Sequence, residues 1–343
     1  MRGRKGRAAV GLVIGAVMAG AVVVAVAIFL RKGPALPKEY TYDLTELRKV
    51  DPKLILFQPT WRIHSGLQDA HAVAVGADGR IYLAGDQAIR ILPPEAAEKE
   101  PDPAQIRTIQ TTAAPRCLAV AEDGTVYVGA ADHVEVYDAK GKLKASWPAP
   151  AEKALLTSIA LGEEDVFAAD AANHVVLRYD RSGKLTGRIG KRDVGRNIPG
   201  LIARGPYLDL AVAGDGLLRV VNPGLLRIEA YTRDGDLEVW WGEASPDISG
   251  FAGCCNPVSF AILPDGGFVT CEKGIRRVKL YDADGRFVGV VAGPDSFADA
   301  AAPGPGRQPA GELDVAADAK GRVFVLDPYT AELKVFARKA KAD

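Results

Sequence analysis

A pattern of short strands and tight turns returns six times between residues 54 and 339, and it constrains the fold more than any other feature of the sequence. Each copy begins with a strand of alternating apolar residues, continues through a turn and a second strand, and in most copies has a third strand that ends beside an aromatic residue. Six copies of a four-stranded unit predict an all-β fold, a six-bladed β-propeller. The first strands read HAVAV (71–75), RCLAV (116–120), TSIAL (157–161), LDLAV (208–212), VSFAI (258–262) and LDVAA (313–317).

Tight turns follow most of these first strands. Asp-Gly favours a short hairpin because glycine readily adopts the positive φ that such a turn requires. We therefore expect antiparallel hairpins inside each copy. The turns are Asp78-Gly79, Asp123-Gly124, Asp215-Gly216, Asp265-Gly266 and Lys320-Gly321.

The two ends of the repeat region indicate how the ring closes. The last copy stops after its third strand, residues 333–337, while an unassigned strand, residues 54–63, precedes the first copy. An open ring would leave a sheet edge exposed. We expect residues 54–63 to supply the missing outer strand of the last blade.

The repeat resembles that of the NHL-repeat family, whose units place an Asp-Gly turn and an Asp-x-x-Asn element around the second strand. The copies at 115–148 and 156–190 are the most similar. The chain departs from the family pattern at Arg196–Pro206 and Pro294–Ala310, which look like loop insertions, and at Asn222-Pro223-Gly224 in the fourth copy. The resemblance implies a propeller that serves as a scaffold, a binding platform or, in some members, an enzyme.

Alternation along each first strand places its second and fourth residues on one face, which we expect to be the face toward the propeller axis. The fourth residue is alanine in all six copies: Ala74, Ala119, Ala160, Ala211, Ala261 and Ala316. The second residue is Ala72, Cys117, Ser158, Asp209, Ser259 or Asp314. Two carboxylates among small polar groups indicate either a water-filled channel mouth or a divalent cation such as Ca²⁺ held by Asp209 and Asp314.

All four histidines are expected on one rim of the ring, because the connections from fourth to first strands and from second to third strands share that rim. The histidines are His64, His71, His133 and His174. Some propeller enzymes, including the NHL-type amidating lyase that the resemblance brings in, bind a metal with histidines around the axis. None of the four lies in a matching motif, so the sequence leaves open whether they bind a metal or are ordinary loop residues.

The same rim is expected to carry the loop Cys254-Cys255-Asn256, with Cys271 nearby at the end of a second strand. The chain has no Cys-x-x-Cys spacing, so haem attachment and a zinc ribbon are not expected. The alternatives are a disulfide from Cys254 or Cys255 to Cys271, a vicinal Cys254–Cys255 disulfide, buried free thiols, a thiol-based redox role, and metal ligation. Cys117 is expected to pack as a small apolar residue near the channel.

The N-terminus differs from the rest of the chain. The whole sequence has 43 basic and 43 acidic residues, but residues 1–32 hold six basic residues and no acidic one. The uncharged stretch 8–30 would span roughly 34 Å as a helix, which is enough to cross a membrane. We expect a cytoplasmic tail (1–7), a transmembrane helix (8–30), a tether (31–53), the propeller (54–339) and a short tail (340–343). A cleaved signal peptide is the alternative.

The charge pattern also bears on location and partners. The basic residues before the apolar stretch place the N-terminus in the cytoplasm and the propeller outside, in the periplasm or at the cell surface, as a signal-anchored protein. The remaining residues carry 37 basic against 43 acidic side chains, which gives no basic excess for a nucleic acid.

These features predict a membrane-tethered binding or scaffold module that uses the histidine and cysteine rim for a protein or small ligand, more than they predict an enzyme. Two alternatives remain at this point. One is a metal-dependent lyase or hydrolase at the channel mouth with Asp209, Asp314 and His71. The other is a redox accessory protein that uses the Cys254-Cys255 loop.

Overall fold

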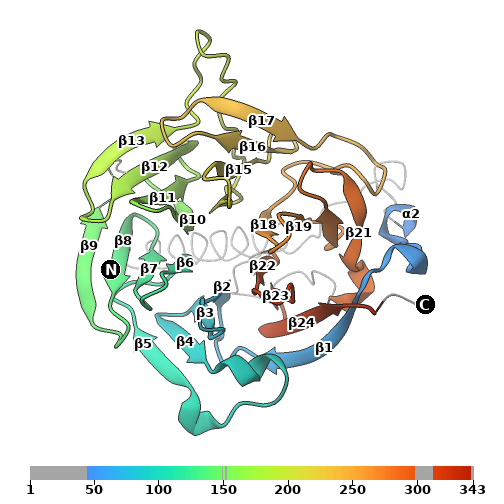
Figure 1. Cartoon of the computed structure of the whole chain (residues 1–343), viewed down its shortest axis with the longest axis horizontal. Helices are drawn as coiled ribbons and strands as arrows, with labels where there is room; N and C mark the ends of the chain where they lie inside the picture. The colour runs from blue at the N-terminus through green and yellow to red at the C-terminus, as the bar shows by residue number, and fades with distance from the viewer. Residues whose placement is uncertain (1–44, 149, 151–152, 298–311, 341–343) are drawn as a thin grey trace, which may run out of the picture. The chain divides into compact units, whose positions relative to one another are not determined.

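The computed structural model describes residues 45–148, 150, 153–297 and 312–340 of the chain. These residues form one compact unit, in which six four-stranded antiparallel sheets are arranged around a central axis (Figure 1). The predicted all-β, six-bladed propeller of four-stranded blades is confirmed. The predicted tail and transmembrane helix, residues 1–30, and most of the predicted tether lie outside the described residues.

The blades follow the chain in order. Blade 1 contains β2 (Ala70–Val75), β3 (Ile81–Gly85), β4 (Ala88–Leu92) and β5 (Arg107–Gln110). Blade 2 contains β6 (Cys117–Val120), β7 (Val126–Gly129), β8 (His133–Tyr137) and β9 (Leu143–Pro148). Blade 3 contains β10 (Leu156–Leu161), β11 (Asp165–Asp170), β12 (Val175–Asp180) and β13 (Leu185–Ile189).

The second half of the ring repeats this arrangement. Blade 4 contains β14 (Leu210–Val212), β15 (Leu218–Asn222), β16 (Arg227–Tyr231) and β17 (Leu237–Trp241). Blade 5 contains β18 (Ser259–Ile262), β19 (Phe268–Cys271), β20 (Val278–Tyr281) and β21 (Phe287–Ala292). Blade 6 contains β22 (Asp314–Ala317), β23 (Val323–Asp327) and β24 (Glu332–Arg338), with β1 (Phe57–His64) as its outer strand.

The pairing of β1 with β24 closes the ring as the sequence predicts. The two strands are antiparallel, with Ile63 opposite Leu333, and Figure 1 shows the N-terminal strand beside the C-terminal one at the outer edge of blade 6. Just before β1, the backbone N–H of Leu56 donates to the carbonyl of Val290 in β21, at 2.9 Å. The chain at the start of β1 therefore joins blades 5 and 6.

The predicted turns are present. Gly79, Gly124, Gly216, Gly266 and Gly321 all have φ between 74° and 82°. Asp78 shows how the preceding residue helps, because its Oδ1 accepts a hydrogen bond from the backbone N–H of Arg80 at 3.0 Å. A side chain with a β-carbon would be strained at the glycine positions, so the turn sequence and the hairpin geometry agree.

The hydrophobic core is divided among the six interfaces between neighbouring blades. The cluster between blades 1 and 2, for example, contains Ile89 and Ile91 of β4 together with Val126 and Val128 of β7. Trp147 lies between blades 2 and 3, with its ring centroid 5.7 Å from that of Tyr127 and 5.8 Å from that of Tyr179. Burial of apolar side chains between neighbouring sheets thus stabilises each interface between blades.

The two tryptophans at the end of β17 differ from each other. Trp241 packs against Phe268 and Tyr281 of blade 5, as expected for a residue between blades. Trp240 is instead 51% exposed, and the guanidinium of Arg227 lies over its ring at 4.5 Å. The reason is strand alternation, which turns neighbouring side chains to opposite faces.

Short helical segments connect or precede the strands. They are α2 (Thr45–Arg48) and the 3-10 helices Pro52–Leu54, Pro94–Ala97, Pro103–Gln105 and Pro294–Ser296. Within the part of the chain that the structure describes, no helix is long and apolar enough to cross a membrane.

Candidate functional site

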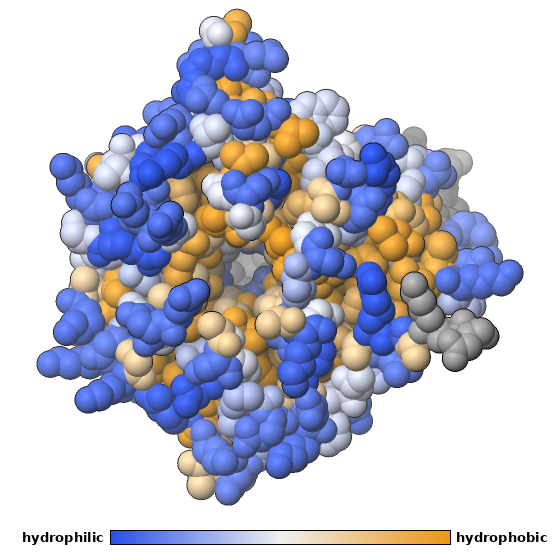
Figure 2. Space-filling model, in the orientation of Figure 1, coloured by the Kyte–Doolittle hydropathy of each residue, from blue (hydrophilic) through white to orange (hydrophobic). Residues whose placement is uncertain are grey.

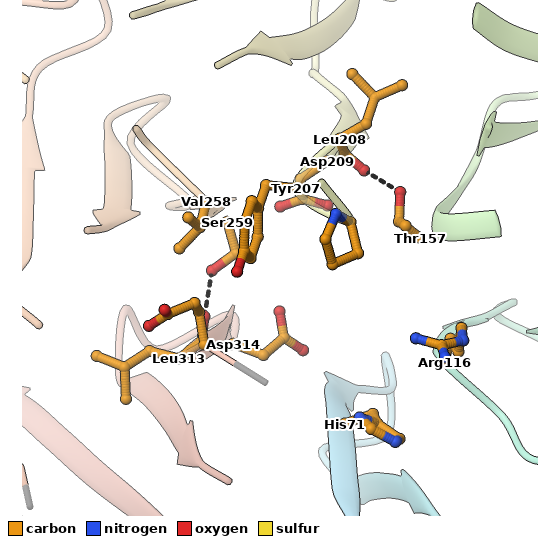
Figure 3. Close-up of a pocket in the computed structure, with 12 residues that line it drawn as sticks. His71, Arg116, Thr157, Tyr207, Leu208, Asp209, Val258, Ser259, Leu313 and Asp314 are labelled. Atoms are coloured by element: carbon orange, nitrogen blue, oxygen red, sulfur yellow. Dashed lines mark hydrogen bonds between the residues drawn. The ribbon is translucent and has the colours of Figure 1, made fainter. Parts of the chain in front are cut away.

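Two adjoining cavities, of about 110 and 150 Å³, lie at the propeller axis where the first strands of the blades converge. His71, Arg116, Thr157, Asp209 and Asp314 line both of them. We call this pair of cavities the axial pocket; Figure 2 shows a hollow at the centre of the molecule, and Figure 3 shows the side chains around the pocket.

The repeat explains which residues meet in the axial pocket. All six second residues of the first strands line it, which confirms that this face points to the axis: Ala72, Cys117, Ser158, Asp209, Ser259 and Asp314. The first residues of the same strands form a second layer around one cavity: His71, Arg116, Thr157, Leu208, Val258 and Leu313. The fold therefore assembles the pocket from two layers, each with one residue from every blade.

Asp209 joins blade 4 to blade 5. Its Oδ2 accepts a hydrogen bond from the backbone N–H of Phe260 in β18 at 2.8 Å, and its Oδ1 accepts one from its neighbour Leu210 at 2.9 Å. This carboxylate at the axis is thus satisfied by one backbone donor of its own blade and one of the next blade, which lowers the cost of holding it among protein atoms.

Other axial side chains make the same kind of contact with the following blade. Asp314 Oδ2 accepts from the backbone N–H of Val73 at 2.8 Å, which joins blade 6 to blade 1. Ser259 Oγ donates to the carbonyl of Leu313 at 2.9 Å, and Ser158 Oγ contacts Leu210 at 3.3 Å. We call Ser158, Asp209, Ser259 and Asp314 the interblade clasps. They account for four of the five residues that the sequence assigns to the channel.

The electrostatics of the axial pocket favour positive charge. Burial raises the pKa of Asp209 to about 6, and burial together with the charge of Asp209 raises the pKa of Asp314 to about 7. Among the described residues, no lysine or arginine forms an ion pair with either carboxylate. Burial also raises the pKa of Glu312, a third carboxyl group in the wall. Uncompensated carboxylates in a confined space attract a cation.

Arg116, Thr157, Tyr207 and Glu312 line the pocket although sequence reasoning did not select them. Figure 3 shows Arg116 and His71 across the open space from Asp209 and Asp314. The sequence could have indicated two of these residues, because Arg116 and Thr157 each directly precede a residue that was assigned to the axis. Tyr207 and Glu312 lie in connections before the first strands, where no repeat pattern marks them.

The predicted rim histidines are not gathered together by contacts in the structure. His71 is in the axial pocket, with its Nε2 3.1 Å from Asp69 Oδ2, whereas His64 Nδ1 accepts from the backbone N–H of Gly66. His174 lies between β11 and β12 with a positive φ. In the described ranges, no group of three or more His, Cys, Asp or Glu residues is arranged to hold a metal ion.

His133 belongs to a partly buried hydrogen-bond network inside blade 2. Its Nδ1 lies 2.7 Å from Asp132 Oδ1, and its Nε2 lies 3.1 Å from Oε1 of the fully buried Glu135. Burial lowers the pKa of His133, but the hydrogen bonds to Asp132 and Glu135 outweigh it and raise the pKa above its ordinary value. Arg227 and Glu229 form the same pair in blade 4, at 2.6 Å, so this position is a structural ion pair.

The cysteine loop lies at the entry to blade 5. All four cysteines are free thiols in the structure, so neither the disulfide considered for Cys271 nor the vicinal one is present: Cys254 is exposed, while Cys117, Cys255 and Cys271 are buried. Cys271 belongs to the core between blades 5 and 6, and Cys117 to the core between blades 2 and 3, as expected for the latter. Asn256 is buried and accepts a hydrogen bond from the backbone N–H of Lys273 at 2.9 Å.

Comparison with known proteins identifies the fold class. A streptogramin B lyase structure superposes with a TM-score of 0.52 at 12% identity, covering 81% of this chain and 98% of that one. A protein of unknown function from Bacteroides thetaiotaomicron gives 0.54 at 18% identity, covering 80% and 70%. The WD40 β-propeller domain of Doa1 gives 0.52 at 16% identity, covering 79% of each chain.

These likenesses show a β-propeller fold and, at such low identity, nothing about activity. No family model matches the chain, and no curated protein matches its sequence. The class that fold and site define is therefore a six-bladed β-propeller with an acidic axial pocket.

Proposed function

We propose that this chain is a membrane-tethered, extracytoplasmic, NHL-type β-propeller that binds a small cationic ligand, or a cationic side chain of a protein partner, in the axial pocket. The observation that carries the proposal is the charge of the pocket wall. Three carboxyl groups, Asp209, Glu312 and Asp314, face one guanidinium group, that of Arg116.

The raised pKa values of Asp209 and Asp314 support a cationic ligand. A bound cation would favour the ionised carboxylates, which burial now disfavours, so its binding would be coupled to loss of protons near neutral pH. Each clasp carboxylate remains anchored by a backbone donor of the next blade, so the charge is held in place before any ligand arrives. Such preorganisation lowers the entropy cost of binding.

The wall also offers an apolar side. Pro206, Tyr207 and Leu208 lie at one edge of the pocket, next to the carboxylates. A ligand with an ammonium group attached to a small apolar or aromatic body would match this combination, since pockets of this kind pair an apolar wall with a few oriented polar groups.

Calorimetric titration of the purified propeller with three matched probes tests the ligand class. Benzylamine, benzyl alcohol and benzoate share one ring and differ in charge. At about pH 8, where the carboxyl groups are ionised, we expect benzylamine to bind at least about tenfold more tightly than the other two. Benzoate binding as tightly as benzylamine would contradict a cation site, because it would assign the dominant role to Arg116.

Fractionation of cells that express the full chain tests the tether. We expect the intact chain in the membrane fraction after an alkaline carbonate wash, and protease added outside the inner membrane should degrade the propeller. A chain that lacks residues 1–44 is the matched control and should be released. A soluble product that begins near residue 28 would show that the Ala-Val-Ala sequence at 25–27 is cleaved instead.

A further inference from the structure

Neither the fold nor the axial pocket explains why Cys254 and Cys255 are adjacent free thiols. Cys254 is exposed, while Cys255 is 4% exposed and donates a hydrogen bond from Sγ to the carbonyl of Arg204 at 3.9 Å. The Cys254 thiol therefore faces solvent, whereas the Cys255 thiol is covered by protein. A dissolved reagent therefore reaches Cys254 more readily than Cys255.

The surroundings of the pair differ on its two sides. Gly253 is exposed, and no atom lies within 4 Å of the place where a β-carbon would be, so the chain before the pair has open space. Asn256 follows the pair and is fixed by hydrogen bonds to Ala252 and Lys273. Space is therefore open before the pair, whereas the residue after it is fixed.

The surroundings of Cys255 favour its protonated form. Burial raises the pKa of Cys255, the nearby ammonium group of Lys273 opposes this, and the Cys254 thiol raises it further through charge and a hydrogen bond. The raised pKa keeps the Cys255 thiol protonated, so Cys255 is not the thiol that reacts first.

We infer that Cys254 and Cys255 form a dithiol–disulfide couple that reacts with small-molecule disulfides. The Cys254 thiolate attacks one sulfur of the disulfide, which breaks the S–S bond of the reagent, releases one thiol and leaves a mixed disulfide on Cys254. The Cys255 thiolate then attacks Sγ of Cys254, forms the vicinal disulfide and releases the second thiol. The protein loses two hydrogen atoms, and the reagent disulfide is reduced to two thiols.

The couple lies beside the chain segment that forms one wall of the axial pocket. Arg204, whose carbonyl Cys255 contacts, begins the segment that leads to Pro206 and Tyr207 in the pocket wall. The inference does not depend on the ligand that the pocket binds.

Mass spectrometry of the purified propeller after treatment with oxidised glutathione tests the couple. Chymotrypsin should release the peptide 252–260, which contains Cys254 and Cys255 without Cys271. We expect this peptide from the wild-type protein to lack two hydrogen atoms and to regain them with dithiothreitol. In Cys255→Ser, a glutathione adduct on Cys254 should accumulate to at least about ten times its wild-type level, because no thiol resolves it.

Matched variants make the result decisive. Cys271→Ser and Cys117→Ser should behave as the wild type, and Cys254→Ser should not react. A stable glutathione adduct on Cys254 in the wild type would overturn the inference, and so would a disulfide that includes Cys271. Circular dichroism of each variant checks that the propeller is folded.

Discussion

The carboxylate of Asp209 in blade 4 accepts a hydrogen bond from the backbone N–H of Phe260 in blade 5, at 2.8 Å. Asp314 and Val73 repeat this relationship between blade 6 and blade 1, also at 2.8 Å. The same carboxyl groups line the axial pocket. Ring stability and the proposed ligand binding therefore depend on the same side chains, and a ligand that engages them should also stabilise the ring.

Replacing Asp209 with alanine should destabilise the propeller. The change leaves the N–H groups of Leu210 and Phe260 without their acceptor, and we expect a loss of about 1 to 3 kcal/mol in the free energy of unfolding. Chemical denaturation followed by circular dichroism measures it. Asp265→Ala is the control, because Asp265 accepts only from Gly267 in its own turn. An equal loss in both variants would argue against the interblade clasp.

The protonation of Asp314 should make stability depend on pH. Its pKa in the folded chain is about 7 against an ordinary 3.8, so the folded state binds the proton more tightly than the unfolded state. The resulting stabilisation is complete below about pH 4 and is lost as the pH rises toward 7. Asp314→Asn keeps an acceptor for Val73 but cannot titrate, so its free energy of unfolding should fall less steeply over this range.

Denaturation curves at several pH values measure this difference, with Glu122→Gln as a control at an exposed carboxyl group. The control should retain the wild-type slope. If Asp314→Asn has that slope as well, Asp314 does not carry the proton.

The closure of the ring by β1 gives a third prediction. Ile63 is 3% exposed and packs into the core between blades 6 and 1. Ile63→Ala should cost about 3 kcal/mol, whereas Arg62→Ala should stay within about 0.5 kcal/mol because Arg62 points to solvent on the other face of the strand. Thermal unfolding compares them. Equal melting temperatures would mean that β1 adds little to the closed ring.

The content of divalent metal provides a fourth prediction. Asp209 and Asp314 already accept backbone hydrogen bonds, and the described residues show no metal-holding group of three. We expect elemental analysis of the purified propeller to find no stoichiometric metal and EDTA to leave the melting temperature unchanged. One bound metal ion per chain would revive the alternative of a metal-dependent lyase or hydrolase at the channel mouth.

Much of the fold was predictable because each blade repeats the same local rules. Alternation located the first strands and the residues that face the axis, and the missing strand after residues 333–337 identified β1 as the closing strand. These features depend on residues that are close together in the sequence, so they can be identified from one sequence.

The site was predictable only in part, because it depends on contacts between blades. The position of Asp209 was clear from the repeat, but its acceptor role toward Phe260 requires the next blade, 51 residues away. Tyr207 and Glu312 reach the pocket from irregular connections, where no periodicity applies. The sequence singled out the Cys254-Cys255 loop, but it did not reveal that Cys271 belongs to the core between blades 5 and 6 while Cys255 contacts the carbonyl of Arg204.

The most direct test of cation binding in the axial pocket is calorimetric titration of benzylamine into matched variants at about pH 8. The variants are Asp314→Asn and Glu312→Gln, the second of which leaves the Asp314–Val73 hydrogen bond in place, with Glu122→Gln as the control. We expect each pocket variant to weaken binding by about tenfold and the control to bind as the wild type. Binding of benzylamine that remains within about twofold of wild type in both pocket variants would place the cation site elsewhere.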